Sequence, residues 1–221
     1  MADGVAAPQE ATHVPGDGVL RLGYAGRVEP NRGIENLLEA VDLVRKDGIA
    51  VRLRIAGSGQ LHYERLIRHQ IETLGLGSTV ELCGHLREKS KADFFKCMDL
   101  AVIPSQLEIG GTVAAEALAH AVPVVVSTAT PWSRVAEVGC GAWVDSEPGT
   151  LARAIRDLSR APLRQMGERG RQWMVAEFAW EQIAQQMYRG YRSLLRGKSS
   201  VVAATKKGTS FEPSPYTSRP N

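Results

Sequence analysis

Short apolar runs alternate with segments of helical periodicity along most of this chain, and that alternation constrains the fold more than any other feature. Residues 33–48 repeat apolar side chains at the spacing of a helix and stop at Gly48. PVVVS at 123–127 is apolar throughout, which is typical of a strand buried on both faces. The expected strands are 19–26, 51–57, 79–84, 100–105, 123–127 and 141–145. The expected helices are 33–48, 61–75, 88–98, 111–121 and three more within 149–197.

Strands separated by helices in this way predict an α/β fold, with a single Rossmann-like parallel sheet and helices on both faces. The 221 residues suit one large domain, and 43% hydrophobic with 23% charged residues is a globular composition. We expect a flexible lead-in at 1–18, a folded domain at 19–198 and a disordered tail at 199–221. Ligands of parallel sheets bind at the carboxyl ends of the strands, so the loops that follow the strands should carry the chemistry.

Composition and spacing argue against several functional classes. No run of about 18 apolar residues predicts a transmembrane helix, and the first 18 residues lack the features of a secretory signal. Cys83, Cys97 and Cys140 show no metal-ligand spacing, so we expect reduced, mostly buried thiols, no metal site and a cytoplasmic location. A formal net charge of +3 is too small to indicate binding to nucleic acid.

Two loops carry residues suited to a phosphate ligand. GRVEPNRG at 26–33 holds Arg27 and Arg32, whose guanidinium forks suit phosphate oxygens. Two solvated surface arginines are the alternative interpretation. AGSGQ at 56–60 places glycines after a strand, but it is not a GxGxxG sequence, so a plain tight turn is favoured over a dinucleotide site.

The most informative stretch is residues 104–127. Glu108 follows a strand, Gly110 and Gly111 open a helix, and Glu116 lies on that helix among apolar residues. Exposed amides at a helix start form an anion cradle, whereas a carboxylate suits sugar hydroxyls, which donate hydrogen bonds. Alternatively, Glu108 stabilises the helix electrostatically and Glu116 pairs with a nearby arginine.

Taken together, the motifs GR-x4-RG, AGSG, PS-x2-E-x7-E-A, PVVVS, TPWS and GCG-x-WV resemble the C-terminal half of family 4 glycosyltransferases of the GT-B fold. The resemblance covers residues 19–195. The TPWS and GCG variant is most similar to bacterial enzymes of surface-polysaccharide or lipopolysaccharide assembly. The spaced pair of glutamates is its most specific signal.

The resemblance implies a domain that binds a UDP- or GDP-sugar donor for retaining transfer to a glycan or lipid-linked acceptor, without an obligatory metal. The donor diphosphate would be held by arginines and the distal phosphate by helix amides. Glutamates would contact the sugar and the ribose, and the backbone near 84–86 would face the base. The implied residues are Arg27, Arg32, Gly110, Gly111 and Thr112 for the phosphates, Glu108 as the catalytic residue at the sugar, Glu116 for the ribose and His85 near the base.

The chain also departs from the family pattern. The N-terminal acceptor domain has no counterpart in the sequence, so we expect a separate protein to supply it. Ile109, Gly110, Ala121 and Arg134 replace the usual residues at their positions. A non-catalytic nucleotide-sugar-binding module and a degenerate remnant therefore remain alternatives.

The last helices are rich in lysine and arginine. From 151 to 198 there are ten such residues against four acids. This excess suits peripheral contact with an anionic membrane, although a solvated helical surface is the favoured interpretation.

Overall fold

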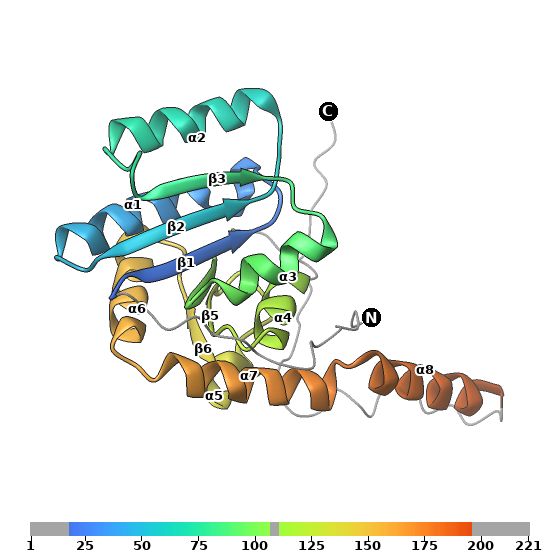
Figure 1. The fold of residues 1–221 in the computed structure, drawn as a ribbon. Helices are drawn as coiled ribbons and strands as arrows, with labels where there is room; N and C mark the ends of the chain where they lie inside the picture. The colour runs from blue at the N-terminus through green and yellow to red at the C-terminus, as the bar shows by residue number, and fades with distance from the viewer. Residues whose placement is uncertain (1–17, 107–110, 196–221) are drawn as a thin grey trace, which may run out of the picture. The chain divides into compact units, whose positions relative to one another are not determined.

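A computed structural model of the protein describes residues 18–106 and 111–195 (Figure 1). The strands are β1 (Leu20–Ala25), β2 (Val51–Ala56), β3 (Val80–Gly84), β4 (Leu100–Ile103), β5 (Val124–Ser127) and β6 (Gly141–Val144). The helices are η1 (Pro30–Arg32), α1 (Ile34–Lys46), α2 (Leu61–Thr73), α3 (Glu88–Lys96), α4 (Thr112–Ala119), α5 (Arg134–Val138), α6 (Pro148–Ser159), α7 (Leu163–Glu177) and α8 (Trp180–Leu195). All six expected strands are present.

The six strands form one parallel sheet in the order β3-β2-β1-β4-β5-β6, which confirms the predicted fold class. β1 lies near the centre, paired with β2 on one side and β4 on the other (Figure 1). The strand order reverses at β1, so the loops after β1 and β4 diverge above the sheet. Such a switch point opens a crevice at the carboxyl ends of the strands.

A hydrophobic core lies on each face of the sheet. One core gathers the apolar faces of α1, α2 and α6, and the other gathers those of α3, α4, α5 and α7. β5 serves both, because Val125 belongs to the first core while Val124 and Val126 belong to the second. This division explains why β5 has no polar residue before its last one, Ser127.

Two short elements were not predicted, and some side chains differ from expectation. η1 and α5 span three and five residues, too short to show a helical period. Trp132 and Trp173 are buried, whereas Trp143 and Trp180 are 40% and 56% exposed. Of the three free cysteines, only Cys140 is fully buried, while Cys83 is half-buried and Cys97 is exposed.

The chain divides into two compact units, the first ending at Ile183 and the second beginning at Ala184. This boundary falls within α8, and the described residues of the candidate site all lie in the first unit. A search of the described helices finds none long and apolar enough to cross a bilayer. The extent of the folded domain, 19–198, stays a prediction.

Ala121 adopts a backbone conformation that suits glycine. It follows the last turn of α4 with a φ of 58°, the only positive φ at a non-glycine among the described residues. A left-handed conformation costs a residue with a Cβ about 1–2 kcal/mol. The chain therefore carries strain at a position where its relatives were expected to have glycine.

We predict that Ala121→Gly stabilises the protein by about 1 kcal/mol, because the strain exceeds the added entropy of the unfolded chain. The midpoint of thermal unfolding should rise by about 2–4 °C. Circular dichroism melts would measure this, with Ala119→Gly inside α4 as the control. That control should lower the midpoint, and a fall in Ala121→Gly as well would contradict the assignment of strain.

Candidate functional site

The loops after β1, β2 and β3 meet backbone to backbone at the carboxyl edge of the sheet. Gly26 N donates to Ala56 O at 2.9 Å, and Gly57 N donates to Gly84 O at 2.8 Å. Gly57 has a φ of 144°, and a Cβ at this position would lie 1.7 Å from Gly26 O. Gly57, the first glycine of the AGSG sequence, is therefore required for the close approach of the β1 and β2 loops. This agrees with a turn and not with a dinucleotide-binding sequence.

The loops after β1 and β4 are joined at a second point. A Cβ on Gly33 would lie 2.2 Å from Pro104 O, so only glycine allows the β4 loop to approach here. Gln106 N donates to Asn31 O at 3.0 Å in the same region. This junction brings the start of α1 beside the loop that leads to α4.

Two adjoining cavities of about 250 and 200 Å³ lie over these loops. They share the end of β1, Arg27 and Val113. The larger is also lined by residues of the β2 and β3 loops and of α3, namely Ala56, Gly57, Ser58, His85, Leu86 and Lys91. The smaller is lined by Tyr24, Arg32, Ile103, Ser105 and Thr112. The structure thus brings together, around two adjoining cavities, Arg27 and Arg32 from the first loop and Thr112 and His85, which the resemblance implied.

The two arginines differ in their surroundings. Tyr24 donates its hydroxyl to Arg27 O at 2.7 Å, which fixes the backbone at the end of β1. The Arg27 guanidinium is 66% exposed and contacts Glu29 Oε1 at 3.0 Å. Arg32 lies at the end of η1 and is partly buried, with its Nε atom shielded from solvent. Both cations line the smaller cavity.

The start of α4 closes the site. α4 begins at Thr112, whose preceding residue Gly111 has a φ of 58°. A Cβ on Gly111 would lie 2.2 Å from the indole Nε1 of Trp132, in the TPWS sequence. The amides of this helix start belong to the predicted anion cradle. Glu108, Ile109 and Gly110 lie outside the described residues, so their predicted parts are not placed by the structure.

Glu116 pairs with a lysine that the sequence did not single out. Its Oε2 lies 2.5 Å from Nζ of Lys91 on α3, so the cation is a lysine and not the arginine expected as the alternative. His120, one turn later, contacts the main-chain oxygen of Glu116 through Nδ1 at 2.8 Å, and this contact does not involve the Glu116 carboxylate. Glu116 is not among the described lining residues of either cavity, whereas Lys91 lines the larger one.

Arg134 stands where the family usually has an acidic residue, and its side chain forms an ion pair away from the cavities. Its guanidinium donates to both carboxylate oxygens of Glu177, at 2.6 and 2.9 Å, and lies 5.0 Å from the ring centroid of Trp173. These hydrogen bonds hold the pKa of Glu177 below its usual value. The reversed charge is therefore neutralised by α7, and Arg134 lines neither cavity at the carboxyl edge.

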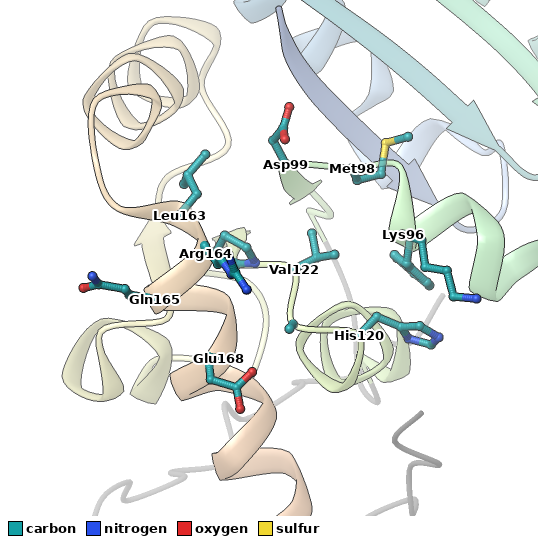
Figure 2. A pocket seen from close by; sticks show the side chains of 12 residues that line it. Lys96, Met98, Asp99, His120, Val122, Leu163, Arg164, Gln165 and Glu168 are labelled. Atoms are coloured by element: carbon teal, nitrogen blue, oxygen red, sulfur yellow. The ribbon is translucent and has the colours of Figure 1, made fainter. Parts of the chain in front are cut away.

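A larger cavity of about 500 Å³ lies at the opposite, amino edge of the strands (Figure 2). Figure 2 shows Lys96 and His120 on one side and Arg164 and Glu168 of α7 on the other. The lining holds two lysine or arginine residues and two acids, and one of the acids, Asp99, accepts a hydrogen bond from Arg21 N at 2.7 Å. Among the described residues, the charges of this lining balance, and none of the predicted donor residues is part of it. The site with converging cations is the carboxyl edge, in spite of its smaller volume.

The sequence profile of glycosyl transferases group 1 matches residues 10–173, about three quarters of the chain. The chain belongs to this family. D-inositol 3-phosphate glycosyltransferase from Segniliparus rotundus is 32% identical over 85% of this chain and 43% of its own length. A GDP-mannose-dependent α-(1-6)-phosphatidylinositol dimannoside mannosyltransferase from Mycobacterium tuberculosis is 26% identical over 76% of this chain and 42% of its own length. The chain thus spans less than half the length of these two relatives.

Solved structures agree with the family. Sucrose-phosphate synthase from Thermosynechococcus elongatus superposes with a TM-score of 0.74 at 28% identity, covering 83% of this chain and 47% of that protein. HepE from Anabaena, solved with UDP and glucose, has a TM-score of 0.71 at 22% identity, covering 80% of this chain and 49% of its own. The latter likeness establishes the shared fold. In this group 1 domain, no three His, Cys, Asp or Glu residues lie together as a metal site within 18–106 and 111–195.

We predict that Gly57→Ala destabilises this glycosyltransferase domain by about 2–3 kcal/mol, since the new Cβ would collide with the Gly26 carbonyl and the φ disfavours it. Urea unfolding followed by circular dichroism would measure the loss. Gly77→Ala is the matched control, because no atom lies within 4 Å of its Cβ position, and it should change stability by less than about 0.5 kcal/mol. Equal behaviour of the two variants would contradict the close approach of the loops.

Proposed function

We propose that this domain binds a nucleotide-diphospho-sugar at the carboxyl edge of its sheet and serves as the donor-binding half of a retaining glycosyltransferase. One observation carries the proposal. The contact between Gly33 and the Pro104 carbonyl places Arg27, Arg32 and the start of α4 around two adjoining cavities. Two cations and a helix N-terminus converging on one space suit a diphosphate.

In this proposal the diphosphate occupies the smaller cavity. Arg27 and Arg32 donate to its oxygens, and the amides of Gly111 and Thr112 meet the distal phosphate, joined by Gly110. The macrodipole of α4 adds favourable potential at the same point. The site thereby stabilises the negative charge that grows on the leaving diphosphate as the bond to the sugar breaks. This chemistry needs no metal, because the arginines supply the positive charge.

The remainder of the donor extends from the diphosphate in two directions. The base enters the larger cavity near His85 and Leu86, and the ribose lies toward Glu116. Glu108 contacts the transferred sugar as the catalytic residue. One curated relative is named for GDP-mannose and one fold neighbour was solved with UDP, so both bases belong in the test.

The acceptor is proposed to be a glycan or a lipid-linked molecule of surface-polysaccharide or lipopolysaccharide assembly, as the TPWS and GCG sequences suggest. Groups that orient the acceptor come from outside the described domain, on the same polypeptide or on a separate acceptor-domain protein. A lipid-linked acceptor would bring the protein to the inner face of the cytoplasmic membrane. The basic surface of the last helices suits anionic lipid there.

We predict that Arg27→Ala weakens UDP-sugar or GDP-sugar binding by about tenfold or more, because a charge-assisted hydrogen bond contributes about 1.5–3 kcal/mol. Isothermal titration calorimetry with UDP-glucose and GDP-mannose would measure the change. Arg134→Ala removes the same charge at the Glu177 pair and should leave the affinity unchanged. Equal affinity of wild type and Arg27→Ala would contradict the proposed diphosphate site.

The alternative of a non-catalytic binding module makes a different prediction about turnover. An active domain should slowly hydrolyse its nucleotide sugar in the absence of acceptor, or transfer the sugar once the acceptor half is supplied. Binding without either reaction would favour the module over the transferase.

A further inference from the structure

The ion pair between Lys91 and Glu116 has features that a plain surface pair lacks. Glu116 is carried by α4, whose other residues are apolar apart from Thr112 at its start. Its Oε2 is shielded from solvent and has no hydrogen-bond partner among the described residues, so the 2.5 Å approach of Lys91 Nζ is a charge contact with unfavourable angles. A buried carboxylate oxygen without hydrogen bonds is costly, and it is ready to accept from a ligand.

Lys91 is the member of the pair that faces the ligand space. It lines the larger cavity together with His85, Leu86 and Arg27, and its side chain is 36% exposed. Its ammonium carries three N–H donors, and the contact with Glu116 lies on one side of the group. The others remain able to donate into the cavity.

Nearby charged groups are engaged elsewhere. Arg27 contacts Glu29, and Lys96 on the same helix contacts Asp93 at 3.5 Å. The His120 ring meets the main-chain oxygen of Glu116, not its carboxylate. Lys91 is therefore the cation that the structure assigns to the Glu116 side chain.

We propose that Lys91 is a specificity-determining residue, and that Lys91 and Glu116 read the ribose diol of the donor as one unit. A hydroxyl both donates and accepts, so it can donate to the Glu116 carboxylate and accept from the Lys91 ammonium at the same time. A phosphate, whose oxygens only accept hydrogen bonds, satisfies only the cation. This inference rests on the proposed function, since it takes the ligand to be a nucleoside diphosphate or its sugar conjugate.

The test compares ribose and 2′,3′-dideoxyribose forms of UDP and GDP by isothermal titration calorimetry on the full chain. Wild type should bind the ribose form about tenfold more tightly than the dideoxy form. Lys91→Met should bind the ribose form about tenfold more weakly than wild type does, and the dideoxy form less than about twofold more weakly. The variant should therefore no longer discriminate between the two forms. Lys91→Arg, which restores the charge and donors, should keep most of it.

Lys96→Met is the matched control, because it removes the same charge from the same helix at a residue paired with Asp93. It should bind both forms as wild type does. The Lys91 pair is partly exposed, so its loss should change the thermal midpoint little. Circular dichroism melts would check this, with Lys91→Gln as a second variant if Lys91→Met folds poorly.

The remaining outcomes distinguish a failure of the role proposed for Lys91 from a failure of the proposed donor site. An equal loss for both ligand forms in Lys91→Met, or no loss for either, would overturn the role of Lys91 in reading the diol. Wild-type binding without discrimination between ribose and dideoxyribose would overturn it as well and leave the donor site standing. Wild type that binds none of the four ligands would overturn the proposed function and this inference with it.

Discussion

β1 lies where the order of the sheet reverses, with β2 on one side and β4 on the other, and the arrangement of the candidate site depends on that position. The chain leaves β1 toward α1 on one face and leaves β4 toward α4 on the other. The approach of the Pro104 carbonyl to Gly33 and the hydrogen bond from Gln106 N to Asn31 O keep the two loops together. Arg32 and Thr112, 80 residues apart in sequence, line one cavity as a result.

Two arginines away from the site are neutralised by acidic partners. Arg134 is bound by Glu177, and Arg54 by Glu81 at 2.9 Å. Arg27 and Lys91 also have acidic partners, but both line cavity space and are partly exposed. A diphosphate or a sugar hydroxyl could therefore reach them without breaking into a packed core.

Periodicity was enough to predict the fold from sequence, because each strand and each long helix carries its own apolar pattern. β5 shows this clearly, since burial on both faces leaves no polar position in Val124–Ser127 except its last. α5 escaped detection because five residues complete little more than one turn.

The site was only partly accessible to the same reasoning. Arg27 and Arg32 were found because their loop follows a strand, and all parallel strands end at one edge. Thr112 and His85 were implied by the resemblance to family 4 glycosyltransferases. Lys91 was missed because its partner is 25 positions away and no local pattern marks the pair. The pairing of Arg134 could not be predicted for a similar reason, since Glu177 lies 43 positions further along the chain.

The amino-edge cavity has a practical consequence for anyone who screens small molecules against this domain. It offers about 500 Å³, at least twice the volume of either space at the carboxyl edge, so fragments selected by fit alone would accumulate at the wrong end of the sheet. Cys97 is exposed and lies between Lys96 and Met98, which both line that cavity. A dye on this thiol would report such off-target occupancy directly and let a screen sort its hits by edge before any assay of sugar transfer.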